Sequence, residues 1–271
     1  MPELPEVETT RLGLLPKVKG RRIDEVIVRN RRLRWPIPRN FEKMLAGQTV
    51  GDVHRRGKYL LWDCGTGFVL SHLGMSGSLR ILQAETAALV HDHVDIVFDN
   101  SLVVRYHDPR RFGAMLWLAG RELDHPLLDK LGPEPLSSDF DGNYLHAASR
   151  GRRTSIKEFI MNGHVVVGVG NIYASEALFM AGIDPRRYAG TISRARCNKL
   201  AESIKQTLAN AIRAGGSSLR DYVQADGELG YFQSEAQVYG RDEMPCNVCG
   251  SHVRSIRQGQ RSTYFCATCQ K

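Results

Sequence analysis

The sequence predicts an α+β protein of several domains, because its pattern changes three times along the chain. From about residue 21 to residue 118, apolar and polar residues alternate with the period of two that strands require. From residue 154 to about 222 this alternation gives way to helical spacing, and after residue 233 short strands surround four cysteines. A length of 271 residues suits two or three domains.

The first expected element is a helix from residue 3 to about residue 15. Pro5 suits the first turn of a helix, and Glu6 and Glu8 complement the positive end of its dipole. Pro16 and Gly20 are then expected to end or bend the helix.

Short antiparallel strands are expected next. Residues 94–98 and 102–106 flank a polar turn at 99–101, which is a hairpin signal. Residues 59–62 and 68–70 flank a glycine-containing turn in the same way. Several short strands joined by such turns favour a sandwich or a small barrel over a parallel sheet.

Residues 131–138 are expected to form a linker, because Pro133 and Pro135 interrupt regular structure there. Helices are predicted beyond the linker, at residues 155–161, 172–181 and 193–214.

The formal net charge is +8, which is typical of proteins that bind nucleic acid. An ordinary basic protein can carry the same charge, so charge alone does not decide the partner. The sequence shows no signal peptide and no apolar run that could span a bilayer. We therefore expect a cytoplasmic protein without membrane contact.

Four cysteines near the C-terminus have the spacing of a metal site. Cys246, Cys249, Cys266 and Cys269 form C-x2-C-x16-C-x2-C, which presents four thiolates to one tetrahedral zinc ion. Four thiolates leave no open position for water, so the zinc should be structural rather than catalytic. A redox dithiol pair is the weaker alternative. Cys64 and Cys197 stand alone and are expected to be inert packing residues.

The chain begins Met1-Pro2-Glu3, which suggests covalent chemistry. Removal of Met1 would turn Pro2 into a free secondary amine beside the carboxylate of Glu3, and an amine with an acid is what imine chemistry needs. The structural alternative is that Pro2 merely starts the helix while Glu3 complements its dipole.

Five segments together resemble the bacterial formamidopyrimidine-DNA glycosylases, within the family that also contains endonuclease VIII. They are MPELPEVE at 1–8, HLGMSG at 72–77, DPRRFG at 108–113, VGVGNIYASE at 167–176 and the cysteine-rich C-terminus. The likeness runs from the second residue to the last. Leu4 stands where the endonuclease VIII group has glycine, which favours the branch that acts on oxidised purines.

The resemblance implies a DNA-repair enzyme with three domains. These are an N-terminal β-sandwich catalytic domain with a leading helix at 1–132, a helix–two-turns–helix DNA-binding domain at 133–232 and a zinc finger at 233–271. Such an enzyme works in base-excision repair as a monomer on damaged double-stranded DNA, and is associated with the bacterial nucleoid. It excises 8-oxoguanine and formamidopyrimidines, then cleaves the strand by β,δ-elimination.

The resemblance also assigns roles to individual residues. Pro2 is the nucleophile that forms a Schiff base, Glu3 the acid, Lys58 a proton donor in strand cleavage, and Arg261 the residue of δ-elimination and phosphate contact. Physically, the guanidinium fork of Arg261 suits a backbone phosphate. Without the resemblance, Lys58 would be taken for a surface lysine, and arginines between the cysteine pairs for solvated charge.

The remaining matched residues concern DNA. Met75, Arg110 and Phe112 match the residues inserted into the base stack, and Arg110 is also the candidate for recognising the opposite base. The expected phosphate contacts are His91, Arg152, Lys157 and Asn171. Arg152 lies in Gly151-Arg152-Arg153, which replaces a lysine-rich stretch of the family. His91 and His93 form a pair that could otherwise bind a metal, and residues 224–231 resemble the loop that covers the flipped base.

Three other functions compete with this interpretation. A non-catalytic DNA-binding or architectural protein could use the same basic groove and zinc finger, but it would not need Pro2 or Glu3. An endonuclease VIII-like enzyme would act on oxidised pyrimidines. Zinc ribbons also occur in RNA-binding proteins.

Overall fold

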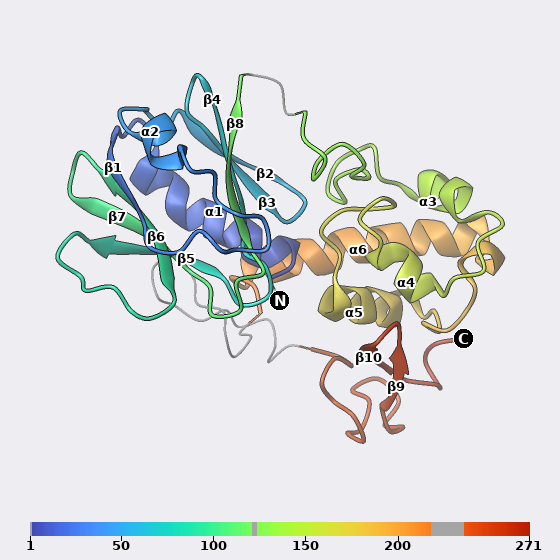
Figure 1. Ribbon diagram of the computed structural model, residues 1–271. Helices are drawn as coiled ribbons and strands as arrows, with labels where there is room; N and C mark the ends of the chain where they lie inside the picture. The colour runs from blue at the N-terminus through green and yellow to red at the C-terminus, as the bar shows by residue number, and fades with distance from the viewer. Residues whose placement is uncertain (1, 121–123, 218–235) are drawn as a thin grey trace. The chain divides into compact units, whose positions relative to one another are not determined.

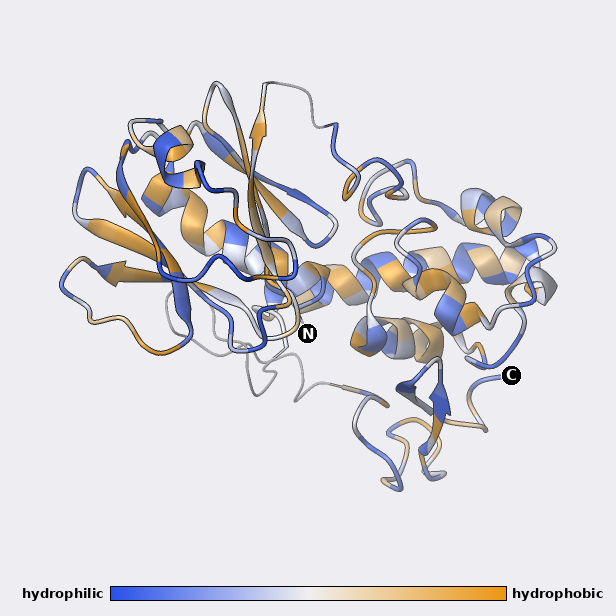
Figure 2. Ribbon diagram, viewed as in Figure 1, coloured by the Kyte–Doolittle hydropathy of each residue, from blue (hydrophilic) through white to orange (hydrophobic). Residues whose placement is uncertain are grey.

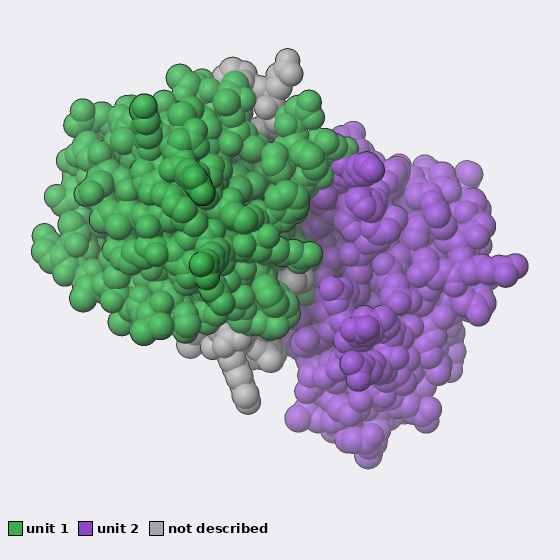
Figure 3. Space-filling model, viewed as in Figure 1, with its two compact units in different colours: residues 1–129, 214–231 green, residues 130–213, 232–271 purple. Residues whose placement is uncertain are grey.

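The computed structural model describes residues 2–120, 124–217 and 236–271 (Figure 1). The chain forms two compact units, which are coloured separately in Figure 3. Unit 1 contains residues 1–129 and 214–231, and unit 2 contains residues 130–213 and 232–271. The covering loop expected at 224–231 lies outside the described residues. Within those residues, every helix is too short or too polar to cross a bilayer.

Unit 1 opens with helix α1 (Leu4–Val18), which extends past the expected end near residue 15. Pro16 lies inside α1 and does not end it. Lys19 N still donates to Leu15 O over 3.0 Å, and the side chain of Val18 is fully buried in the core. We infer that packing of the last turn offsets the backbone bond that proline cannot make.

Two four-stranded antiparallel sheets follow α1. One has the order β1-β6-β7-β5 and consists of β1 (Ile23–Val28), β6 (Asp92–Phe98), β7 (Leu102–His107) and β5 (Ser78–Gln83). The other has the order β2-β3-β4-β8 and consists of β2 (Asp52–Arg56), β3 (Tyr59–Asp63), β4 (Gly67–His72) and β8 (Ala114–Ala119). A short helix, α2 (Phe41–Leu45), precedes β2. Two separate sheets make a sandwich rather than a barrel.

Both predicted hairpins are confirmed. Val97 of β6 pairs with Val103 of β7 across the turn at 99–101, and Trp62 of β3 pairs with Val69 of β4. One hydrophobic core joins both sheets and α1, with Leu14, Trp62 and Tyr106 completely or almost completely buried within it. Figure 2 shows hydrophobic residues in orange along the strands that supply this core.

Unit 2 is helical, with α3 (Gly142–Ser149), α4 (Ile156–Met161), α5 (Asn171–Ala181) and α6 (Arg194–Arg213). The last three helices match the predicted segments to within one residue at each end. Helix α6 packs against α3 and α5. The sequence interpretation missed α3, although Asp141 caps it by accepting a bond from Tyr144 N over 2.7 Å.

The C-terminal part of unit 2 is a hairpin of β9 (Arg254–Gln258) and β10 (Arg261–Phe265). Gly259 and Gln260 join the strands with φ angles of 50° and 62°. Two consecutive positive φ angles are what a tight two-residue hairpin turn needs. The turn therefore places Arg261 at the start of β10, directly after the tip, while β10 packs against α5.

Candidate functional site

Pro2 and Glu3 are buried at the start of α1. Glu3 N donates to Glu6 Oε2 over 2.7 Å, a bond that closes the first turn. The other oxygen of the fully buried Glu6, Oε1, accepts from Ser217 N (2.8 Å) and Ser217 Oγ (2.9 Å). Glu6 thus connects the N-terminal turn to residue 217. The sequence interpretation had assigned Glu6 only to the helix dipole, because residue 217 is distant in the chain.

Lys58 lies in the two-residue turn between β2 and β3, after Gly57 with its φ of 58°. Its charge acts on His72 at the end of β4. Burial, together with the charges of Lys58 and Arg34, lowers the pKa of His72 to about 4. His72 Nδ1 accepts the N–H of Gly74 over 3.0 Å, so neutral His72 carries its proton on Nε2 as a donor. The sequence interpretation did not single out His72.

This pKa predicts a pH dependence of stability. His72 in the unfolded chain takes up a proton near pH ~6.5, before the folded form does, so its contribution to stability is complete above that pH and is lost as pH falls towards 4. The slope attributable to His72 is at most about 1.4 kcal/mol per pH unit. The free energy of unfolding in urea, measured at pH 7, 6 and 5, should therefore fall less steeply with pH in His72→Gln than in the wild type, which gives a flatter acid limb of the stability–pH curve. The same change at exposed His54 should leave the limb unchanged. An identical limb for His72→Gln would contradict the assignment.

Met75 and Phe112 project from two loops of unit 1, with 38% and 41% of their surfaces exposed. The guanidinium of Arg110, on the same loop as Phe112, lies 4.9 Å from the centre of the Phe112 ring. The loops touch through their backbones: a Cβ on Gly74 would lie 2.6 Å from Phe112 C, so only glycine fits there. The structure therefore brings these three predicted residues into one region.

A completely buried carboxylate holds the two loops together. Asp108 Oδ2 accepts from Gly113 N (2.9 Å) and Tyr106 Oη (3.0 Å), while Oδ1 accepts from Ser76 Oγ (3.1 Å). Bonds from both loops to one carboxylate restrict the positions of Met75 and Phe112. The sequence interpretation missed this role of Asp108, because the partners are brought together only by the fold.

His91 is exposed in the loop before β6. Its ring centre lies 6.4 Å from that of His93 and 6.0 Å from that of His107. His93 is buried and its Nε2 lies 2.8 Å from Asp108 O. Among the described residues, the only group of three or more side chains placed to hold a metal is the four cysteines. A metal site at His91 and His93 therefore has no third ligand within the part of the chain that the structure describes.

In unit 2, Lys157 is 1% exposed and lies at the centre of a polar network. Its Nζ donates to Asn171 Oδ1 (2.7 Å), Ser262 O (3.0 Å) and Thr263 Oγ1 (2.7 Å). Asn171 Nδ2 also donates to Ser262 O over 3.0 Å. These bonds join α4, the N-terminus of α5 and β10. All three N–H groups of the ammonium are used, so the network fixes Asn171 and the strand that begins with Arg261.

A cavity of about 280 Å³ beside this network is lined by Lys157, Glu158, Asn171, Gln258 and Arg261, among others. Arg261 is exposed and Asn171 is half-buried. Three of the predicted phosphate-binding residues, Lys157, Asn171 and Arg261, therefore share one concave surface. Arg152 is exposed in the loop between α3 and α4 and does not line this cavity.

The network predicts a measurable loss on Lys157→Met. The substitution keeps the length of the side chain but leaves buried oxygens without their donor, so the free energy of unfolding should fall by about 1–3 kcal/mol. DNA binding should weaken as Asn171 and β10 loosen. Denaturant unfolding and a binding titration measure both effects. Lys199→Met, on the exposed side of α6, is the matched control. Equal stability of the two variants would contradict the role of the network.

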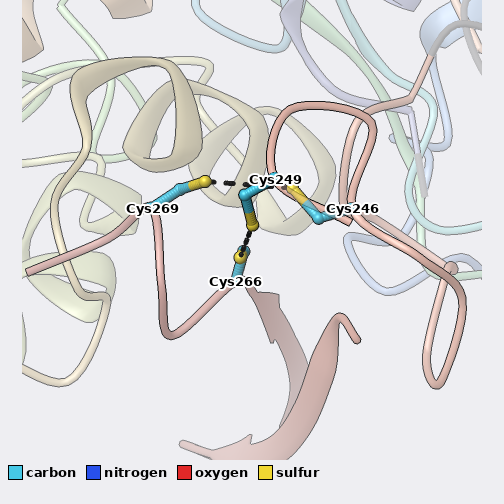
Figure 4. A group of neighbouring side chains, drawn as sticks. All are labelled: Cys246, Cys249, Cys266 and Cys269. Carbon is cyan, nitrogen blue, oxygen red and sulfur yellow. Dashed lines mark hydrogen bonds between the residues drawn. The ribbon is translucent and has the colours of Figure 1, made fainter. Parts of the chain in front are cut away.

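The four cysteines lie within one small sphere, and Figure 4 shows their side chains converging. Their Sγ atoms all lie within 4.8 Å of one another; Cys246 and Cys269 are 3.9 Å apart, and Cys249 and Cys266 are 3.5 Å apart. Tetrahedral zinc with Zn–S bonds of about 2.3 Å requires S···S separations of roughly 3.8 Å. The cysteines therefore fit one structural zinc ion, as predicted. Cys64 and Cys197 are both buried away from this cluster.

Comparison with known proteins covers almost the whole chain. The model of the formamidopyrimidine-DNA glycosylase N-terminal domain matches residues 1–115, that of the H2TH domain of the same enzymes matches 131–223, and that of the zinc finger found in FPG and IleRS matches 245–271. The formamidopyrimidine-DNA glycosylases of Thioalkalivibrio sulfidiphilus and Stutzerimonas stutzeri are 56% and 57% identical to the chain, over 100% of both lengths.

Solved structures agree with these matches. The MutM (FPG) protein of Thermus thermophilus is 36% identical, with a TM-score of 0.89 over 99% of this chain and 98% of that one. The Lactococcus lactis FPG bound to DNA containing Fapy-dG is 33% identical, with a TM-score of 0.90 over 99% of this chain and 100% of that one. The predicted sandwich, H2TH domain and zinc finger are thus confirmed. The chain belongs to the formamidopyrimidine-DNA glycosylase family.

Proposed function

We propose that this protein is a bifunctional glycosylase and AP lyase of base-excision repair. It excises oxidised purines, such as 8-oxoguanine and formamidopyrimidines, from duplex DNA and then cleaves the strand. The observation that carries the proposal is the N-terminal turn: Pro2 and Glu3 are buried at the start of α1, and Glu6 holds that turn by its bond to Glu3 N. The names of the relatives support the substrate class.

The chemistry follows from an N-terminal proline. Once Met1 is removed, the neutral Pro2 nitrogen attacks C1′ of the damaged nucleotide, and the N-glycosidic bond breaks with its electron pair leaving on the base. The departing base takes up the proton that the Pro2 nitrogen loses, which restores the lone pair on that nitrogen. Glu3 protonates O4′ as the sugar ring opens, which leaves an iminium between Pro2 and C1′. The iminium acidifies C2′–H, so loss of that proton expels the 3′-phosphate. A second elimination expels the 5′-phosphate.

Lys58 and Arg261 serve the later steps in this proposal. Lys58 supplies a proton during strand cleavage. Two observations support this role: Lys58 lies in a tight turn, and its charge acts on the side chain of His72. Arg261 binds a backbone phosphate and assists the second elimination, which expels the 5′-phosphate. Its exposure beside Asn171, on a hairpin fixed through Lys157, supports that role.

We further propose that Met75, Arg110 and Phe112 fill the space left by the flipped nucleotide, with Arg110 recognising the base opposite. His91, Arg152 and Asn171 contact phosphates. Lys157 acts by positioning Asn171 and β10, since each N–H of its ammonium is already bonded within unit 2.

Borohydride trapping on a duplex with 8-oxoguanine opposite cytosine tests the proposal, using protein shown by mass spectrometry to lack Met1. The expected result is a covalent adduct that maps to Pro2. No adduct from zinc-loaded protein would leave a DNA-binding protein without lyase chemistry. A parallel duplex containing thymine glycol tests the rival specificity. Preferential trapping on that duplex would assign the protein to oxidised pyrimidines.

A further inference from the structure

A second cavity, of about 430 Å³, lies wholly within unit 1. Arg34, Trp35, Tyr59, His72 and Phe112 line it. Its volume falls within the range of small-ligand sites. Of these residues, only Phe112 has a role in the proposed function.

The walls of this cavity are aromatic and come from several parts of the chain. Trp35 forms a bridge with Ala114 of β8, and Arg34 N donates to Arg111 O over 2.8 Å, so this segment is fixed against the loop that carries Phe112. Trp35 is 40% exposed and Phe112 is 41% exposed. These two large exposed rings line the same cavity, so they are not single hydrophobic residues scattered over the surface. Exposed apolar surface that is grouped in this way marks binding sites.

The same cavity offers two donors for an anion. No described residue makes an ion pair with the Arg34 guanidinium. Burial lowers the pKa of His72 and raises that of Tyr59, and the Arg34 charge acts on both side chains, which line the same cavity. His72 adds a neutral Nε2–H, because its Nδ1 accepts from Gly74 N. The His72 and Tyr59 rings lie 4.8 Å apart, centre to centre. Flat apolar surfaces beside an arginine suit a planar ring that carries a phosphate.

We propose that this cavity binds an unstacked nucleotide, with its base against Trp35 and Phe112 and its phosphate directed to Arg34 and His72. The proposal rests on the proposed function, because Phe112 is the ring that enters the base stack there. Because Phe112 lines the cavity, a nucleotide displaced by that insertion would lie next to the cavity and could enter it. Aromatic side chains stack on any base, so the site accepts all four bases.

Isothermal titration calorimetry on the full chain tests the cavity with 2′-deoxyguanosine 5′-monophosphate and with 2-deoxyribose 5-phosphate, which lacks the base. The nucleotide should bind at least about tenfold more tightly than the sugar phosphate, as expected for one stacked base. Trp35→Ala should abolish that difference, and Arg34→Gln should weaken both ligands. Exposed Arg32→Gln, two residues away, is the matched control. Equal binding of both ligands, or no effect of Trp35→Ala, would overturn the proposal.

A second arm distinguishes nucleotides of bound DNA from free nucleotides. It compares a fully paired lesion duplex with one that has a single unpaired nucleotide beside the lesion. Tighter binding of the second duplex by the wild type, but not by Trp35→Ala, supports a nucleotide of the substrate. Binding of the free nucleotide without this preference supports the cavity as a site for free nucleotides. Excision from the paired duplex is recorded in parallel, so failure of the cavity and failure of the glycosylase are separate results.

Discussion

Glu3→Gln should reduce excision of 8-oxoguanine by between about 10²- and 10⁴-fold, the range typical for loss of a general acid. Gln keeps the size of the side chain but cannot protonate the opening sugar ring. Glu3 is 2% exposed at the first turn of α1, and its backbone N–H is held by Glu6, so the turn itself should persist. Single-turnover kinetics on a lesion duplex measure the chemical step apart from product release.

The matched control for Glu3→Gln is Glu8→Gln on the same helix. Glu8 accepts from Arg11 and Arg55, and those arginines hold its pKa below the ordinary value despite partial burial. Its loss should lower stability without stopping the chemistry. If both variants lost excision equally, the effect at Glu3 would be structural. Full excision by Glu3→Gln would leave the DNA-binding alternative as the better interpretation.

Removal of zinc should abolish specific DNA binding. Structural zinc contributes about 10–16 kcal/mol in isolated zinc fingers, so the β9–β10 hairpin should unfold without it. Arg261 would then lose its place beside Asn171. Each charge-assisted bond lost costs about 1.5–3 kcal/mol, so loss of the contacts made by the hairpin should raise the Kd for a lesion duplex by about 100-fold or more. Cys249→Ser and chelation of the wild type should give the same result in a binding titration.

Cys197→Ala is the control for Cys249→Ser, because Cys197 is a buried cysteine of unit 2 outside the zinc cluster. It should retain one zinc ion per chain and bind DNA. The core of unit 1 contains no residue of the zinc cluster. The near-ultraviolet circular dichroism of Trp62, which is buried in that core, should therefore survive chelation. Unchanged DNA binding by metal-free protein would show that the hairpin is dispensable.

The sequence predicted those parts of the fold that depend on neighbouring residues. Both hairpins of unit 1 followed from alternation around short turns, and the three helices predicted beyond the linker, α4, α5 and α6, followed from apolar spacing. The end of α1 was wrong because burial of Val18 outweighs the local effect of Pro16. Helix α3 was missed although it is longer than α4, because its support comes from packing against α6, which is distant in the chain.

By itself, the sequence identified the zinc site from the spacing of four cysteines, and it supplied the N-terminal proline and glutamate on which the proposed chemistry rests. Only the tertiary structure showed that Asp108 connects the loops that carry Met75 and Phe112, that Glu6 reaches residue 217, and that each N–H of the Lys157 ammonium is bonded. A metal motif is local in the chain, so spacing is sufficient to identify it. A buried carboxylate or ammonium acquires its role from partners up to 211 positions away, and only folding brings those partners within hydrogen-bond distance.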